Sequence, residues 1–269
     1  MIKMNPEYNS IYDGDAIEIM SKFDDSCFDH CITDPPYNIS KENGLAWAFS
    51  SHITMSEEWD TFSRSDYLEF TGKWLKEIMR VVKPNGNIFI FGSYHNIYDI
   101  GYIVNEFDLR IINSITWLKP NAQPNITCRM LTESTEHIIW ICNAPKDKAK
   151  AWAFNYDIAK RLNDGKQMRN MWEIPYPSIK ERRYGKHPSQ KPLDLITRIV
   201  LIATNENDSI LDCFGGSGTT GVVANSFGRR WVLIDSNTEY NEIAKRRIAK
   251  EKIPLPKELL QIGLGLKVR

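Results

Sequence analysis

The residues of this chain best suited to chemistry are Asp34, Pro35, Pro36 and Tyr37. They close an apolar run that begins at Phe28, and two successive prolines end a strand because proline lacks an N–H group and fixes φ. At such a strand end, a carboxylate and free backbone carbonyls can accept both hydrogens of an exocyclic amine. An aromatic ring can stack on the flat heterocycle that carries this amine. A proline-stiffened turn without a ligand is the alternative interpretation.

A second stretch with chemical character lies late in the chain, where the apolar run 209–214 is followed by the glycine-rich turn 215–221. This order predicts a strand, a tight turn and a helix whose first N–H groups face a ligand. Asp212 stands just before the turn. Asp235 ends the next predicted strand, 231–234, where its carboxylate can accept both hydroxyls of a ribose.

The glycines at 216, 218 and 221 also fit a dinucleotide fingerprint, so a nicotinamide-dependent oxidoreductase is an alternative. Two features favour another ligand. A carboxylate at Asp212 suits an amino group better than a pyrophosphate, and only one predicted strand follows, so half of a dinucleotide fold is missing. S-adenosylmethionine carries an α-amino group, a ribose and an adenine but no phosphate, and it satisfies both Asp212 and Asp235.

Alternating strands and helices position these motifs. Apolar runs predict strands at 10–12, 28–33, 87–92, 111–118, 136–142, 209–214 and 231–234. Helical spacing and stop signals predict helices at 16–20, 66–82, 96–106 and 192–204. The alternation favours a mainly parallel sheet with helices on both faces. Asp15, just before the first helix, is expected either to cap it or to bind a ligand at the strand end.

One long segment, 38–65, interrupts the alternation directly after the first motif. It is polar, contains Trp and several Ser residues, and shows no sustained periodicity. Loops of this length are functional or mobile. We therefore predict a mobile flap over the site.

Composition bounds the class of protein. A chain of 269 residues with 42% hydrophobic and 25% charged residues suits one large α/β domain with an insertion, or two small domains. Neither a signal peptide nor a run of membrane-spanning length is expected. The five cysteines form no zinc pattern and their odd count argues against a disulfide framework, which indicates a reduced, cytoplasmic protein. No metal site is expected, because His30, His52 and His137 lack carboxylates at ligand spacing.

The charge is unevenly distributed although the formal net charge is zero. Between Lys119 and Lys191 there are 14 Lys and Arg against 7 Asp and Glu, and the remainder holds 20 against 27. Cations and aromatic residues alternate in 143–186, which is typical of a surface that meets phosphates and bases. A merely solvated surface is the alternative. The aromatic residues expected to stack on bases are Trp152, Phe154, Tyr156, Trp172, Tyr176 and Tyr184.

Together the motifs resemble those of the amino-methylating DNA methyltransferases, over nearly the whole chain. Asp34-Pro35-Pro36-Tyr37 resembles the catalytic motif in the form usual for adenine N6 enzymes, and Phe214-x-Gly216-x-Gly218 resembles the cofactor motif. The stretch 187–192 (His-Pro-Ser-Gln-Lys-Pro) resembles the segment that closes over the methionine end of the cofactor. Two positions depart from the pattern: Ser189 stands where threonine is more usual, and Cys213 where proline is common.

The order of the motifs resembles the β arrangement of this family. It implies a single Rossmann-like α/β domain, circularly permuted, with a mixed, mainly parallel seven-stranded sheet and helices on both faces. The catalytic and cofactor-binding domain would comprise 1–142 and 186–269, with 143–185 as an inserted target-recognition segment.

Two further stretches, 93–98 and 162–168, resemble the DpnA-type enzymes. This resemblance implies GATC as the target, activity on single-stranded as well as duplex DNA, and a functional pairing with a restriction endonuclease. It is compatible with a homodimer.

The resemblance also implies residue roles. Asp34 and Pro35 would hold the N6 amine of an adenine flipped out of the helix, next to Pro36, and Tyr37 would stack on its ring. S-adenosylmethionine would be bound by Asp15, Asp34, Ser189, Lys191, Asp212, Phe214, Gly216, Gly218 and Asp235. DNA would be bound by Lys166, Arg169, Lys180, Arg182 and Arg183. Within this class, methylation of cytosine N4, of RNA or of protein glutamine are alternatives, and a DNA-binding module with a degenerate cofactor pocket is an alternative of another class.

Overall fold

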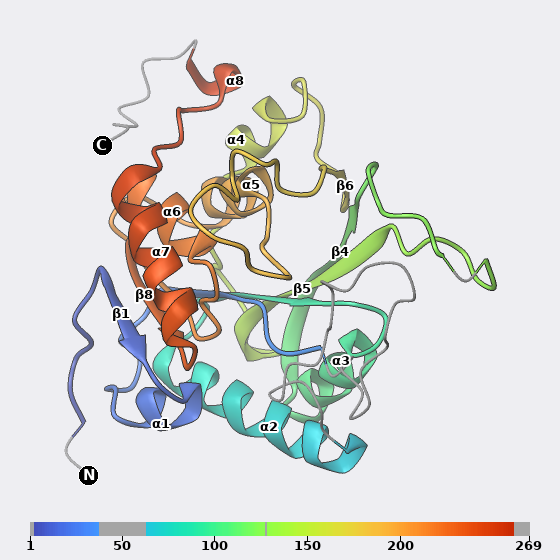
Figure 1. The fold of residues 1–269 in the computed structure, drawn as a ribbon. Coiled ribbons are helices and arrows are strands. Elements are labelled where there is room, and N and C mark those ends of the chain that lie inside the picture. The colour runs from blue at the N-terminus through green and yellow to red at the C-terminus, as the bar shows by residue number, and fades with distance from the viewer. Residues whose placement is uncertain (1–2, 38–62, 127, 261–269) are drawn as a thin grey trace.

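One sheet of eight strands forms the centre of the protein, which is seen here as a computed structural model that describes residues 3–37, 63–126 and 128–260 (Figure 1). The strand order is β1-β8-β7-β2-β3-β5-β4-β6. The strands are β1 (Ser10–Asp13), β2 (His30–Thr33), β3 (Asn87–Gly92), β4 (Leu109–Leu118), β5 (Thr135–Pro145), β6 (Met171–Glu173), β7 (Ser209–Asp212) and β8 (Arg230–Asp235). Only β5 runs antiparallel to its neighbours, β3 and β4, so the prediction of a mixed, mainly parallel sheet is confirmed.

Helices cover both faces of the sheet (Figure 1). One face carries α1 (Ala16–Ser21), α2 (Arg64–Val81) and α3 (Ile97–Glu106). The other carries α4 (Tyr156–Arg161), α5 (Leu193–Ala203), α6 (Thr219–Ser226), α7 (Thr238–Lys250) and α8 (Lys257–Leu260). Within the described residues, no helix is both long and apolar enough to cross a membrane.

The central strands alternate between these two cores. In β3, Ile88 and Ile90 pack with α1–α3, whereas Phe89 and Phe91 pack on the opposite face. Successive side chains of a strand point to opposite faces, and both faces are covered, so every residue of β3 is buried. In β3 the only polar side chain, that of Asn87, therefore stands at the end of the strand.

The eighth strand, β6, was not expected from the sequence. It spans three residues and pairs in parallel with Thr116–Leu118 at the end of β4. Three residues with one inward-facing side chain, Trp172, are too few to show a periodicity of two. The prediction of seven strands is therefore wrong by one, because a piece of 143–185 joins the sheet.

The predicted flap lies almost entirely outside the described residues, which omit 38–62. Its last residues are helical: Ser63 caps α2 by accepting a hydrogen bond from the N–H group of Asp66, and the helix begins at Arg64. The prediction of a loop is therefore wrong for Arg64 and Ser65, and it stays a prediction for 38–62.

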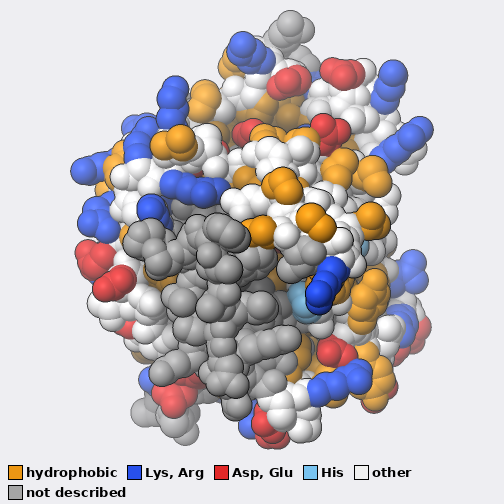
Figure 2. Space-filling view, turned by 45° about the vertical axis from the view of Figure 1, so that its right-hand side comes forward, with side chains coloured by type: hydrophobic (Ala, Val, Ile, Leu, Met, Phe, Trp, Pro, Cys, Tyr) orange, Lys and Arg blue, Asp and Glu red, His pale blue; other side chains and the backbone are white. Residues whose placement is uncertain are grey.

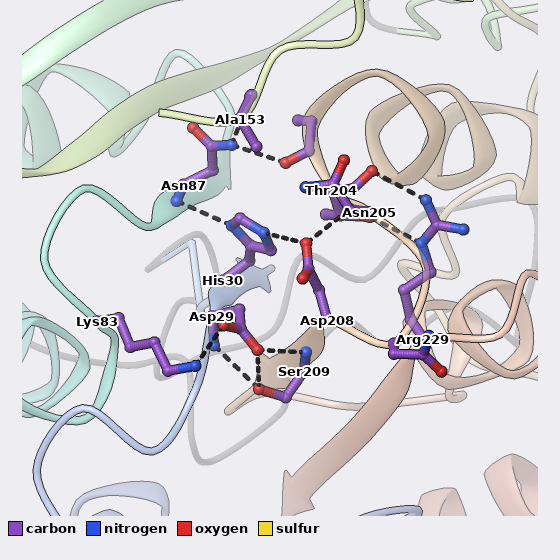
Figure 3. Close-up of polar contacts among 12 residues, drawn as sticks. Asp29, His30, Lys83, Asn87, Ala153, Thr204, Asn205, Asp208, Ser209 and Arg229 are labelled. Carbon is purple, nitrogen blue, oxygen red and sulfur yellow. Dashed lines mark hydrogen bonds and ion pairs between the residues drawn. The ribbon is translucent and has the colours of Figure 1, made fainter. Parts of the chain in front are cut away.

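A polar cluster ties the amino ends of β2, β3 and β7 together (Figure 3). Asn87 donates from Nδ2 to the carbonyls of Ala153 (2.8 Å) and Ala203 (2.7 Å), and its Oδ1 accepts from Trp140 Nε1 (2.9 Å). The N–H group of Asn87 donates to Nδ1 of His30. The first part of 143–185 is thereby fixed at the amino edge of the sheet.

We expect Asn87→Ala to lower the free energy of unfolding by about 2–4 kcal/mol, because it leaves one buried donor and two buried acceptors unpaired. Urea unfolding measures this change. Asn105→Ala is the matched control, since Asn105 is exposed on α3, and it should change stability by less than about 0.5 kcal/mol. Equal effects of the two substitutions would contradict a structural role for this cluster.

Candidate active site

Asp34 is the first residue after β2, at the carboxyl edge of the sheet. Tyr37 Oη donates to its Oδ1 (2.7 Å), and Lys191 Nζ donates to its Oδ2 (2.5 Å). The side chain is 18% exposed. Burial raises the pKa of Asp34, while the Lys191 ammonium and the Tyr37 hydroxyl oppose this rise. The structure thus brings Asp34, Tyr37 and Lys191 together, and the contact of Lys191 with Asp34 adds to the role toward the cofactor that the sequence predicts for it.

The backbone of the Pro-Pro turn is held from the side of α2 and α3. The carbonyl oxygen of Pro36 accepts from Tyr67 Oη (3.0 Å) and Asn96 Nδ2 (3.4 Å), and Asn96 Oδ1 accepts from the N–H group of Ser93. Within the described residues, the carbonyl oxygen of Pro35 accepts no hydrogen bond. The carbonyl oxygen of Pro36, in contrast, is engaged by two side chains of the protein.

Two charged residues of the site were missed by the sequence reasoning, Glu136 on β5 and Lys119 after β4. Glu136 Oε2 lies 3.1 Å from Tyr37 Oη and 3.5 Å from Lys191 Nζ, and Glu136 Oε1 lies 3.3 Å from Lys119 Nζ. A signal was present, because Glu136 is an acid at the start of the predicted apolar strand 136–142, and a carboxylate buried there needs a partner.

Lys191 is the central cation of the site, with 6% of its side chain exposed. Burial disfavours its charge, but Asp34 and Glu136 outweigh this effect and the pKa of Lys191 lies above its ordinary value. The ammonium also lies over the rings of Tyr37 (5.2 Å) and Phe91 (5.6 Å). Lys191 is therefore stabilised as an ammonium between two carboxylates.

Asp212, at the end of β7, is bound by the protein itself. It accepts from Thr33 Oγ1 (3.1 Å), Thr220 Oγ1 (2.7 Å) and the N–H group of Phe214 (3.2 Å). Burial raises the pKa of Asp212 to about 7, against the stabilising effect of these donors. The ring of Phe214 packs edge-on against Trp74, which fixes the turn to α2.

The glycines of the turn are required by close neighbours in the protein. Gly216 (φ 48°) and Gly218 (φ 78°) have left-handed backbones. A Cβ atom on Gly216 would lie 2.8 Å from Nε2 of His187, and one on Gly218 would lie 2.6 Å from Cβ of Ala244. The glycine pattern therefore lets the turn pass between 187–191 and α7.

Asp235 ends β8 beside Asp13 of β1. Its Oδ2 accepts from the N–H group of Gly216 (2.7 Å) and its Oδ1 from that of Asn237 (2.8 Å). Burial raises its pKa. The carboxylate thus faces the glycine turn, and each oxygen keeps a lone pair for a ligand.

The remaining predicted cofactor residues lie at the same edge. Asp15 is exposed and accepts from the N–H group of Glu18, so it caps α1. Ser189 is exposed, and its N–H group donates to Nδ1 of His187 (3.3 Å). Of the two expectations for Asp15, the structure shows the capping role.

The predicted DNA-contacting cations are all exposed and fall into two groups at opposite ends of β6. Lys166 and Arg169 precede the strand, and Lys180, Arg182 and Arg183 follow it. Within the described residues, none of the five forms an ion pair with a carboxylate. Figure 2 shows Lys and Arg side chains along the rim of one face, with acidic side chains between them.

The second group lies beside the segment that carries Lys191. Glu181 accepts from Gln190 Nε2 through its backbone carbonyl and from the N–H group of Leu193 through Oε2, both at 2.9 Å. These two bonds fix 180–183 next to the first turn of α5.

Four of the aromatic residues expected to stack on bases lie in the core or at the amino edge of the sheet. Trp172 is buried in the core, with 3% exposed. Phe154 and Tyr156 are exposed at the amino edge, where the N–H group of Asn155 donates to the carbonyl of Ile202 at the end of α5. Trp152 packs partly buried against the same core. Because Trp172 is buried, the expectation that it stacks on bases is wrong. For Trp152, Phe154 and Tyr156 that expectation stays a prediction.

Among the described residues, no group of three His, Cys, Asp or Glu side chains is arranged to hold a metal ion. What the site offers is an acceptor pair at Asp34 and Pro35, an aromatic ring beside it, and two further carboxylates on neighbouring strand ends.

The buried carboxyl of Asp212 predicts a specific pH dependence of stability. Its folded pKa of about 7 lies above the ordinary 3.8, so its contribution to stability is complete below about pH 4 and is lost as the pH rises through about 7. Asp212→Asn keeps an acceptor and cannot ionise. We expect the stability of this variant relative to the parent to rise between about pH 4 and pH 8, by up to about 4 kcal/mol.

Thermal unfolding of both chains across this pH range measures the effect. His187 acts in the opposite direction, because burial together with Lys191 and Arg247 lowers its pKa to about 3 and its neutral form loses stability as the pH falls below about 6.5. Both chains contain His187, so their difference isolates Asp212. A difference in Tm that stays constant with pH would contradict the prediction.

Comparison with known proteins agrees with this geometry. The family model N6_N4_Mtase, described as DNA methylase, matches residues 28–246. The chain is 40% identical over 257 residues to Type II methyltransferase M2.DpnII of Streptococcus pneumoniae, covering 93% of this chain and 95% of that protein. It is also 40% identical over 240 residues to Type II methyltransferase M2.MboI of Moraxella bovis, covering 88% and 86%.

Solved structures show the same fold. The M1.HpyAVI–SAM complex has a TM-score of 0.63 and 30% identity, covering 89% of this chain and 98% of that one. The cytosine-N4-specific PvuII DNA methyltransferase has a TM-score of 0.67 at 18% identity, covering 93% and 95%, which establishes likeness of fold alone. With a family model matching most of the chain and relatives at 40% identity over nearly their full length, this chain belongs to the family of N6/N4 DNA methylases.

Proposed function

We propose that this chain transfers a methyl group from S-adenosylmethionine to the N6 amine of adenine in DNA. The observation that carries the proposal is Asp34 at the end of β2, with Tyr37 beside it and next to it the carbonyl of Pro35, which accepts no hydrogen bond from the described residues. Relatives at 40% identity are named Type II methyltransferases, which supports the reaction class.

The acidic character of the site fits a cationic cofactor. Burial raises the pKa of Asp34, Asp212 and Asp235, so each carboxylate is held at a cost in free energy. A ligand with a sulfonium and an ammonium group lowers this cost, whereas the phosphates of a dinucleotide would raise it. The M1.HpyAVI structure, at 30% identity, is a complex with SAM.

When bound, S-adenosylmethionine supplies a methyl group on a good leaving group. Asp235 would accept the ribose hydroxyls, and Ser189 and Lys191 would lie toward the methionine end. Asp212 is only 5% exposed and accepts three hydrogen bonds from the protein, so its proposed role is to hold the turn at 213–216 and add negative potential. Asp15 would contribute indirectly, by capping α1 and so fixing the start of this helix next to the site.

On the other side of the site, Asp34 and Pro35 would accept the two hydrogens of the target amine. The N6 lone pair is delocalised into the adenine ring, and accepting both hydrogens favours a more tetrahedral nitrogen and stabilises the charge that develops on it. Tyr37 would stack on the ring. Cytosine N4 offers the same pair of hydrogens, and the aspartate in the motif favours adenine by resemblance.

For DNA we propose that recognition uses the second half of 143–185. Lys180, Arg182 and Arg183 lie by the segment that carries Lys191, whereas the first half is held at the opposite edge by Asn87. Lys166 and Arg169 would extend the contact along β6. GATC as the site, tolerance of single strands, a paired restriction endonuclease, a homodimer and a cytoplasmic location stay predictions of the resemblance.

The test is methyl transfer to oligonucleotides. A GATC oligonucleotide should be methylated on adenine both alone and annealed to its complement, because an unpaired base avoids the cost of flipping. A scrambled sequence should not react, and Asp34→Ala should lose at least about a hundredfold in turnover. Methylated cytosine would overturn the N6 assignment, and full activity of the Ala variant would remove Asp34 from the reaction.

A second test concerns phosphate contacts. Replacing Lys180, Arg182 and Arg183 by alanine should weaken duplex binding and flatten the plot of log K against log salt by up to roughly 0.9 per lost contact. Fluorescence anisotropy at several salt concentrations measures the slope. The control replaces Lys146, Lys148 and Lys150, which lie near Asn85 and Asp108 at the amino edge. An equal slope for both triple variants would mean that the cations of 180–183 are exposed to solvent and do not contact phosphates.

A further inference from the structure

Two donors in the site each lie between the same two carboxylates. Lys191 Nζ is 2.5 Å from Asp34 Oδ2 and 3.5 Å from Glu136 Oε2. Tyr37 Oη is 2.7 Å from Asp34 Oδ1 and 3.1 Å from the same Glu136 oxygen. Glu136 is 13% exposed, and like Asp34 it lies near both Lys191 and Tyr37.

In this arrangement each oxygen of Asp34 already accepts one hydrogen bond, and one of the two donors is an ammonium. An acceptor that already receives a short bond from an ammonium is a weak partner for an incoming amine, since its charge is largely neutralised. The developing positive charge on N6 would also lie close to the ammonium of Lys191, which is unfavourable in a site this buried. Asp34 therefore has to be released from Lys191 before it can serve the proposed reaction.

We propose that Glu136 is a positioning residue that takes over Lys191, and with it the hydroxyl of Tyr37, when the target base binds Asp34. Lys191 Nζ needs to move only a short way to bring Glu136 from 3.5 Å to hydrogen-bond distance. The shift moves hydrogen bonds and no proton, so Lys191 remains an ammonium throughout. This inference rests on the proposed methyl transfer, and it adds the step that unmasks Asp34.

Lys119 holds the carboxylate of Glu136 in place and compensates its charge. Its Nζ lies 3.3 Å from Glu136 Oε1, on the opposite oxygen from Lys191, and over the rings of Trp117 and Tyr176. With 3% of its side chain exposed, Lys119 compensates the second carboxylate without entering the space around Asp34. Two carboxylates and two ammonium groups then balance, and one ammonium can change partner at constant net charge.

The test compares Glu136→Gln with the parent in single-turnover methyl transfer to a GATC duplex. The amide has no charge to draw Lys191 away, so we expect the rate constant to fall about tenfold or more, with the KM for S-adenosylmethionine within about twofold. The control is Glu133→Gln, an exposed acid just before the same strand, which should react like the parent. Tm values establish that each variant is folded.

The pH dependence of the methyl-transfer rate tests whether Glu136 acts on Asp34 through its charge or only supports the local structure. Asp34 is faced by Lys191, Glu136, Tyr37 and Asp212, and among these Glu136 raises its pKa while Lys191 lowers it. Removing the charge of Glu136 should therefore move the acid limb of the rate profile to lower pH. A purely structural residue would slow the reaction without moving this limb.

Glu136→Asp is the second variant and guards against loss of folding in the first. It keeps the charge, so the acid limb should stay near that of the parent, and its shorter side chain should give a smaller loss of rate. A parent-like rate in Glu136→Gln, an unmoved acid limb, or equal losses in the two variants would each overturn the inference. A parent chain that methylates no DNA would instead overturn the proposed function.

Discussion

Burial of the central strands on both faces is the constraint on which the rest of this structure depends. β3, β7 and β8 carry apolar side chains toward α1–α3 and toward α4–α8 alike, so no polar group can be accommodated along their length without a partner. The chemistry of the protein is consequently concentrated at strand ends. Asp34, Asp212 and Asp235 each stand at or just beyond the last residue of a parallel strand, and parallel strands end at one edge.

The same constraint explains how much could be predicted from the sequence. Long apolar runs such as 87–92 gave the strand bounds directly, because burial on both faces leaves a continuous hydrophobic signal. The prolines at 35 and 36 and the glycines at 216 and 218 marked the two loops of the site for the same backbone reasons that the structure shows. These features are local, and local patterns are what a single sequence records.

What could not be predicted depends on tertiary packing. Glu136 and Lys119 become site residues only because β4 and β5 return next to β3, which no spacing in the sequence indicates. Trp172 looks like a platform for bases in sequence and is a core residue in space, since β6 adds to the edge of β4. The charge count of 119–191 likewise could not show that its lysines at 146–150 lie at the amino edge, beyond the end of β5.

The strand order has a consequence for how the chain is made. β2 lies between β3 and β7, and Asp29 and Ser209, which hydrogen-bond at the start of this pair, are 180 residues apart. β1 pairs with β8, which is made after all other strands. During synthesis, one edge of β2 therefore stays unpaired until β7 is made, and β1 stays unpaired until β8 is made. Closure of the sheet is a late, non-local event, and a nascent chain that stalls before β7 exposes two apolar strand edges to its neighbours.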